Sequence, residues 1–282
     1  MTSRLIRRLH RLLGPLAAAS AVLAFTASTV LSAERECGAR GSDIILKAYP
    51  TAQKISEREF KVGGETIALP ADGSDDPHGL ICRIWPARPE LMLVAAPLMT
   101  SQSDDGNEGD IELIVVDSDS LKPKARLRLP DLLTDDAVFV SSVAFDTARY
   151  HLSRSDNAFG LRIARRGSSG PNPFGETTLW LFVIDENGLR PVLDNLVVAE
   201  DQGEWDTNCA GEFQATERTL AMGRPMPGGY SDILVAEKMT KTISTLAPDG
   251  TCVDDKSTVP SERPLRFQGT AYVTPEDLKR ID

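Results

Sequence analysis

The sequence predicts an all-β protein, built as an antiparallel sandwich or a propeller-like meander and stapled by disulfides. Short runs rich in β-branched and apolar residues recur about every 8 to 15 residues. Turn residues, chiefly glycine, proline and aspartate, separate these runs. After the N-terminal region, no long segment has the 3.6-residue period of a helix. Sandwich and propeller both remain open, because the sequence shows no clear repeat of blade length.

The first 33 residues predict a cleaved signal peptide. A basic start without acids precedes an apolar run over Leu12–Leu31 that ends in small residues. An uncleaved membrane anchor is the alternative, because the run approaches the roughly 20 residues that span a bilayer. Gly14 and Pro15 weaken a stable span. We therefore expect a periplasmic or secreted protein with no stable membrane span after cleavage.

Residues 34–282 are predicted to form a single all-β domain, with a possible soft division near 130–150. The formal net charge is −10, and loss of the signal-peptide arginines makes the mature chain more acidic still. Such a chain repels the phosphates of nucleic acid, which excludes nucleic-acid binding as a primary role. An envelope protein or a small ligand remains as the expected partner.

The four cysteines fit an oxidising compartment, because all lie beyond the signal peptide and their number is even. Three pairings are possible, and we favour Cys37–Cys82 with Cys209–Cys252. Each closes a loop of about 45 residues, for which the chain-entropy model gives at most about 4 kcal/mol. There is no CxxC motif, so neither a thioredoxin-like site nor a zinc knuckle is predicted.

The first half of the chain begins with a short strand or helical turn at Gly41–Tyr49. A hairpin about two glycines follows at Phe60–Leu69. Two polar loops are expected at Asp72–Gly79 and Ser101–Asp110. The remaining strands of this half are expected at Gly79–Trp85, Leu91–Leu98, Ile111–Asp117, Ala125–Leu129 and Phe139–Phe145.

The second half continues the meander. An exposed loop is expected at Arg165–Gly175, given its glycines and prolines. One helical turn is expected within Pro275–Ile281. Strands are expected at Ala158–Ile163, Thr177–Ile184, Leu189–Leu193, Leu196–Ala199, Arg218–Met222, Asp232–Glu237, Thr242–Leu246, Pro264–Phe267 and Thr270–Val273.

The stretch Asp201–Phe213 is the densest mixture of acids, glycine, tryptophan and cysteine in the chain. Trp205, Glu204 and Glu212 are our candidate ligand-binding residues, because a tryptophan beside carboxylates resembles a sugar platform. Glu204, Asp206 and Glu212 are weak catalytic candidates, because a glycosidase needs two carboxylates. The structural interpretation, which we favour, makes Trp205 a packing anchor beside a disulfide at Cys209.

Other chemistries have little support. No GxSxG elbow is present, and His78 and His151 are interpreted as solvated side chains. No metal site and no cofactor are predicted. A calcium-stabilised module is the weaker alternative, because Asp104–Asp110 and Asp72–Asp76 have the oxygen density of calcium loops without the EF-hand spacing. Arg165 and Arg166 could hold an anion through bidentate geometry, but a charged turn is the commoner explanation.

Four segments resemble a family of uncharacterised exported bacterial β-rich proteins. They are Asn172–Val183, Gly203–Glu212, Gly229–Val235 and Cys82–Ala87. The resemblance covers most of the mature chain and implies export and one shared fold. It implies no activity and no catalytic residues.

Together these observations lead us to expect an exported, non-enzymatic binding or interaction protein of the cell envelope. The competing hypothesis is a carboxylate-based, glycosidase-like hydrolase acting on envelope material through Glu204, Asp206 and Glu212.

Overall fold

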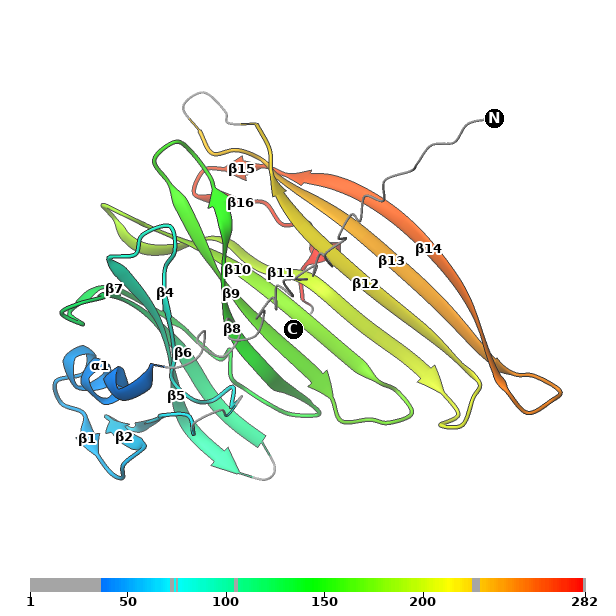
Figure 1. The fold of residues 1–282 in the computed structure, drawn as a ribbon, viewed down its shortest axis with the longest axis horizontal. Helices are drawn as coiled ribbons and strands as arrows, with labels where there is room; N and C mark the ends of the chain where they lie inside the picture. Colours follow the sequence, from blue (N-terminus) through cyan, green and yellow to red (C-terminus); the bar gives the residue numbers. More distant parts are fainter. Residues whose placement is uncertain (1–36, 72–73, 75, 104–105, 225–228, 281–282) are drawn as a thin grey trace, which may run out of the picture.

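The computed structural model describes residues 37–71, 74, 76–103, 106–224 and 229–280 (Figure 1). These residues form two antiparallel seven-stranded sheets and one two-stranded sheet. The predicted all-β fold is confirmed, and its architecture is a sandwich. The predicted signal peptide lies outside the described residues. Within the described ranges, no helix is both long and apolar enough to cross a membrane.

The first sheet, sheet A, has the strand order β1-β2-β3-β5-β6-β7, with β4 paired to β5. The β2–β3 hairpin confirms the hairpin predicted at Phe60–Leu69, and β6 and β7 pair as a second hairpin. The strands of sheet A are β1 (Gln53–Lys54), β2 (Glu59–Val62), β3 (Glu65–Ala68), β4 (Ile81–Ile84), β5 (Leu91–Ser103), β6 (Gly106–Asp117) and β7 (Pro123–Leu129).

The second sheet, sheet B, is a simple meander in which each strand pairs with its neighbour in the sequence. Its strands are β8 (Val138–His151), β9 (Asn157–Gly167), β10 (Phe174–Asp185), β11 (Gly188–Trp205), β12 (Gly211–Met222), β13 (Ile233–Leu246) and β14 (Cys252–Leu265). A short hairpin of β15 (Phe267–Gln268) and β16 (Ala271–Tyr272) follows, and then the turn η2 (Glu276–Leu278) confirms the predicted helical turn.

A helix covers the outer face of sheet A. The short turn η1 (Gly38–Arg40) leads into the helix α1 (Gly41–Ala48). Of the strand and the helical turn expected at Gly41–Tyr49, the strand is therefore wrong. Ile44, Ile45 and Ala48 are buried against sheet A, and their spacing gives the helix one apolar face. The predicted Cys37–Cys82 disulfide is confirmed and joins the start of this layer to β4.

A partly buried polar network lies at the end of the helix in the same layer. The Tyr49 hydroxyl donates a hydrogen bond to Glu112, which also accepts two hydrogen bonds from Arg126 at 2.8 and 2.7 Å. The Arg126 guanidinium lies 4.9 Å from the centre of the Tyr49 ring. Burial, followed by the Glu112 carboxylate, raises the pKa of Tyr49. Tyr49 and Glu112 are buried and Arg126 is exposed, and the hydrogen bonds among the three groups make the burial of Glu112 tolerable.

Figure 1 shows sheet A lying beside β8–β10 of sheet B. The main core lies between the two sheets and is centred on aromatic side chains. Trp85 from the end of β4 meets Phe159 of β9 edge-on, with ring centres 5.3 Å apart. Phe159 also stacks on Phe182 of β10 at 5.6 Å. All three side chains are at most 1% exposed. The interface between the sheets is therefore a continuous apolar core, which is what a sandwich requires.

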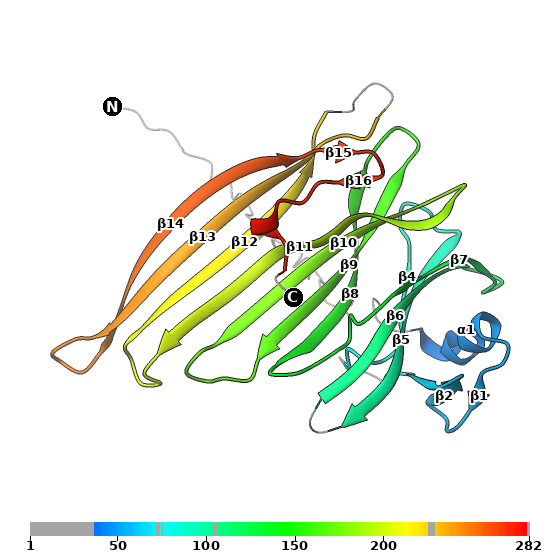
Figure 2. The same ribbon diagram turned by 180° about the vertical axis from the view of Figure 1, so that it is seen from behind.

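The C-terminal segment fills a fork in sheet B. β11 pairs with β12 only from Ala199 to Trp205, although β12 continues beside β13 to Met222. The part of β11 that does not pair with β12 contacts the C-terminal segment. Leu196 forms an antiparallel β-bridge with Lys279, and the Arg280 N–H donates a hydrogen bond to the Asn195 carbonyl at 3.4 Å. Figure 2 shows this segment in red over β11. A separate apolar cluster packs there.

Beyond the fork, sheet B continues as an extension that no other layer formed by the described residues covers (Figure 2). Nearly every residue of its edge strand β14 is exposed, and the predicted Cys209–Cys252 disulfide, which is confirmed, closes its tip. We missed most of β14 because its composition is polar and it contains Pro260 and Pro264. Those residues suit an edge, since proline and charge discourage further strand pairing.

Two predicted loops are wrong. At Ser101–Asp110, β5 runs on to Ser103 and β6 starts at Gly106, so most of the segment is paired. At Arg165–Gly175, the first three residues end β9 and the last two begin β10, which leaves only residues 168–173 between the strands. In both cases the strand pairing continues into polar sequence because a neighbouring strand supplies hydrogen bonds for the backbone.

Candidate functional site

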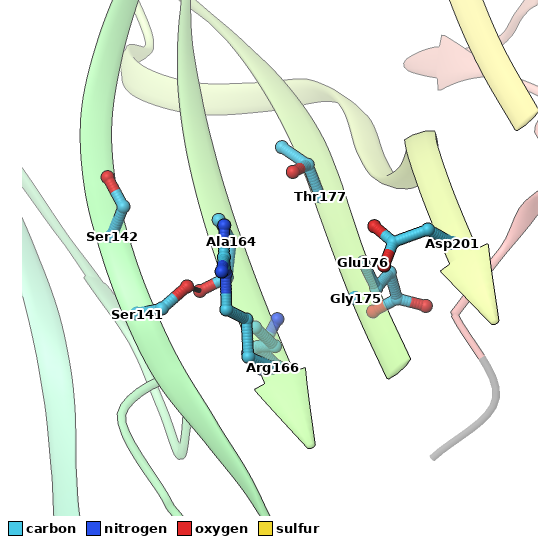
Figure 3. Close-up of a pocket in the computed structure, with 9 residues that line it drawn as sticks. Ser141, Ser142, Ala164, Arg166, Gly175, Glu176, Thr177 and Asp201 are labelled. Atoms are coloured by element: carbon cyan, nitrogen blue, oxygen red, sulfur yellow. Dashed lines mark hydrogen bonds between the residues drawn. The ribbon is translucent and has the colours of Figure 1, made fainter. Parts of the chain in front are cut away.

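A polar pocket of about 410 Å³ lies across four strands of sheet B (Figure 3). Its lining is made of serine, threonine, small and charged residues. The lining residues are Ser141, Ser142, Ala164, Arg165, Arg166, Gly175, Glu176, Thr177 and Asp201. The pocket thus joins the arginine pair of β9 with the start of the Asp201–Phe213 stretch.

Strand register explains how these distant residues meet. Arg166 of β9 pairs directly with Gly175 of β10, and Gly175 pairs directly with Asp201 of β11. Residues directly opposite each other in antiparallel strands point to the same face. Figure 3 shows Arg166 and Asp201 on either side of β10, with Gly175 between them. A cation and an anion therefore flank one position that has no side chain.

Gly175 leaves room for the Asp201 carboxylate within the pocket lining. A Cβ atom at this position would overlap the Asp201 carboxylate, which leans over the glycine. Ala164 and Thr177 continue the floor with small side chains one step along the same face. The hollow is therefore a gap in the row of side chains on a sheet surface.

The two adjacent arginines have different roles. Arg165 is 2% exposed, and its guanidinium donates to the Leu132 carbonyl at 3.1 Å in the segment that joins the two sheets. Arg166 points to the other face and is exposed. Within the described part of the chain, neither the Arg166 nor the Asp201 side chain forms a hydrogen bond or an ion pair. Arg165 is a structural residue, and Arg166 is available to a ligand.

Hydroxyl groups and a second carboxylate complete the lining. The Ser141 hydroxyl donates to the Ala164 carbonyl at 3.2 Å, so its oxygen is held at the wall. Glu176 lies 3.5 Å from the Arg280 guanidinium, which connects this wall to the C-terminal segment. No sequence signal marks Ser141, Ser142 or Thr177, because they are ordinary polar residues within strands.

The predicted ligand residues of the Asp201–Phe213 stretch divide between the two faces of the sheet. Glu204 is directly opposite Glu212, so these two carboxylates share one face. Trp205 follows Glu204 in the strand and therefore points to the other face, the one that carries Asp201. Glu212 forms an ion pair of 2.8 Å with Lys241. None of these three residues lines the polar pocket.

Asp206 caps the turn between β11 and β12. Its carboxylate accepts hydrogen bonds from the backbone N–H groups of Asn208, Cys209 and Ala210 at 2.8 to 3.0 Å. These donors, led by Asn208, hold the pKa of Asp206 below its ordinary value. A carboxylate held ionised in this way is poorly suited to act as a general acid.

Trp205 and Phe213 are packed against glycines. Phe213 is opposite Gly203, and a Cβ atom on Gly203 would overlap its ring. Gly211 is opposite Trp205, and a Cβ atom there would overlap the Cβ of Trp205. The two rings are 6.2 Å apart, and the indole N–H donates to the Gly170 carbonyl at 2.8 Å. Both aromatic side chains remain partly exposed on the face of Asp201.

The prediction that His78 is solvated is wrong. His78 is 9% exposed, with Nδ1 3.6 Å from Asp76 and Nε2 3.6 Å from Asp135. It lines a second pocket, of about 400 Å³, where sheet A meets the segment before β8. His78 is the main reason that the pKa of Asp76 is lowered. His151 is exposed and is hydrogen-bonded to Asn157.

Parts of both possible calcium loops, residues 72, 73, 75, 104 and 105, lie outside the described residues. Elsewhere in the described chain, no group of three or more histidine, cysteine or acidic side chains could hold a metal ion. Gly106–Asp110 is part of β6, where Asp110 contacts Arg128.

Comparison of the chain with protein-family models, curated proteins and solved structures finds no match. The resemblance to exported bacterial proteins therefore stays a prediction.

Proposed function

We propose that this chain is a non-enzymatic binding protein of the periplasm or cell exterior, and that its polar pocket takes a small ligand with an anionic group and several hydroxyls. The observation that carries the proposal is that Arg166 and Asp201 lie on one face of the sheet on either side of Gly175 and, among the described residues, form no hydrogen bond or ion pair. Arg166 offers a planar fork to a carboxylate, and Asp201 accepts hydrogen bonds from hydroxyl or amine donors.

Export is part of the same proposal. The basic and apolar N-terminal pattern predicts a signal peptide, and both disulfides are of the kind that persists in oxidising compartments. A ligand found at the cell envelope is consistent with this location.

The competing hydrolase hypothesis has less support from the geometry. Glu204 and Glu212 lie on the face away from Trp205, and Asp206 is used as a turn cap. A glycosidase needs its two carboxyl groups on either side of one glycosidic bond. The pocket instead offers one cation, Arg166, one carboxylate, Asp201, and hydroxyl groups, which suits binding.

Titration calorimetry with D-glucuronate tests the proposal, because this sugar acid has one carboxylate and several hydroxyls. Arg166→Gln is expected to weaken binding about 10- to 100-fold, since a hydrogen bond to a charged group contributes about 1.5–3 kcal/mol. Arg149→Gln is the matched control, an exposed arginine of β8 outside the pocket, and it is expected to bind as the wild type does. Equal affinity of wild type and Arg166→Gln, or no binding to the wild type, would overturn the proposal.

A further inference from the structure

The face of β11 that carries Asp201 continues beyond the pocket to an aromatic pair. Asp201, Gly203 and Trp205 alternate along β11 and therefore share one face, and Phe213 of β12 lies on that face opposite Gly203. Pocket and aromatic pair thus form one continuous strip. The inference about the ligand of this strip rests on the proposed function, because a ligand of the strip would also occupy the pocket.

The strip is longer than a single sugar. Asp201 and Trp205 are four residues apart on an extended strand, which corresponds to about 13 Å. A monosaccharide held between Arg166 and Asp201 does not reach the indole. A ligand that uses both ends of the strip must therefore be a chain of several units.

The aromatic end offers fixed, partly exposed apolar surface. The indole of Trp205 is held by its hydrogen bond to the Gly170 carbonyl, and Phe213 lies over the backbone of Gly203. Little conformational freedom is left to lose when a ring packs on either side chain. An aromatic ring that carries an apolar face beside polar groups suits the C–H face of a pyranose.

The strip does not suit the backbone of a peptide. An extended peptide is recognised by adding a strand to a free sheet edge. Here β11 is paired on both sides from Ala199 to Gln202, by β10 and by β12, and the backbone of Gly203 and Trp205 is also bonded to residues 171–173. Recognition must therefore come from side chains above the sheet, through hydroxyl, carboxylate and ring contacts.

We infer that the ligand is an oligosaccharide with at least one carboxylate-bearing sugar, which sits in the pocket while a neighbouring ring packs on Trp205 and Phe213. We expect the carboxylates of the glycan to be spaced apart and not packed as in a dense polyanion. The protein has a net charge of −10. Among the described residues that line the pocket, only Arg166 offers an unpaired cation. A glycan in which acidic and neutral sugars alternate has this chemistry.

The test compares D-glucuronate with a hyaluronan tetrasaccharide, in which glucuronate alternates with N-acetylglucosamine, by titration calorimetry. The tetrasaccharide is expected to bind the wild type at least about tenfold more tightly than the monosaccharide does, which corresponds to about 1.4 kcal/mol. Trp205→Ala is expected to remove this gain and to leave glucuronate binding unchanged. Trp205→Phe is expected to keep most of the gain, which shows that a loss in Trp205→Ala does not come from misfolding.

Ile243→Ala is the matched control, since Ile243 is 38% exposed on the opposite face of the same sheet, and it is expected to keep the full gain. Equal affinities for the two sugars in the wild type, or a gain that survives Trp205→Ala, would overturn the oligosaccharide inference and leave the pocket proposal standing. Failure of glucuronate itself to bind would instead remove the proposed function. Tight binding of an acidic peptide with no response to the tetrasaccharide would also contradict the inference.

Discussion

Replacing Cys37 and Cys82 together with alanine is expected to lower the free energy of unfolding by about 2–5 kcal/mol, and by more than the same change at Cys209 and Cys252. The two disulfides close loops of nearly equal length, with sequence separations of 45 and 43. Loop entropy alone therefore predicts equal losses. The difference must come from the folded state.

The surroundings of the two disulfides are unlike. Cys37 and Cys82 are 4% and 2% exposed within the core between α1 and sheet A, so their removal also leaves a cavity. At the tip of the uncovered extension, Cys209 is 4% exposed but Cys252 is exposed, and neither belongs to one of the apolar clusters. Urea unfolding of the two double variants measures both losses. Equal losses, or a larger loss at the tip, would show that α1 and its disulfide contribute less than their burial suggests.

Phe159→Ala is expected to cost about 3–5 kcal/mol, as truncation of a fully buried aromatic residue usually does. Phe159 is 1% exposed and touches Trp85 from sheet A and Phe145 and Phe182 from sheet B, so it belongs to the contact between the sheets. We also expect one cooperative unfolding transition, because the two sheets share this core.

Thermal and urea unfolding, followed by circular dichroism and by tryptophan fluorescence, check both expectations. The matched control is Phe139→Ala, a phenylalanine of the neighbouring strand that is 39% exposed and is expected to cost about 0.5 kcal/mol or less. Two separate transitions in the wild type would show that the sheets are independent units and would place a boundary near the segment that joins them.

Strands that pack against a core could be predicted from the sequence, because their buried side chains are apolar. Leu91–Leu98 and Thr177–Ile184 are apolar because they face buried layers, and both are strands. The polar ends of β5 and β9, the middle of β13 and nearly all of β14 escaped prediction. In the uncovered extension neither face is buried, so selection for packing leaves no alternation to detect.

The candidate site shows the same limit. The arginine pair and the Asp201–Phe213 stretch stand out in the sequence as separate features. Their meeting depends on the register of β9, β10 and β11, which pairs Arg166 with Gly175 and Gly175 with Asp201. Register between long polar strands is not encoded in any local pattern. Likewise, the burial of His78 follows from a contact with Asp135, which is distant in the sequence.

The most direct test of the proposed pocket observes the backbone amide of Gly175 by two-dimensional ¹H–¹⁵N NMR during titration with D-glucuronate. Gly175 forms the floor between Arg166 and Asp201, so its signal reports on the pocket itself. We expect a saturable shift of the Gly175 signal in the wild type and in Arg149→Gln, and no shift in Arg166→Gln. A Gly175 signal that stays in place in the wild type, or that moves equally in Arg166→Gln, would contradict ligand binding at this pocket.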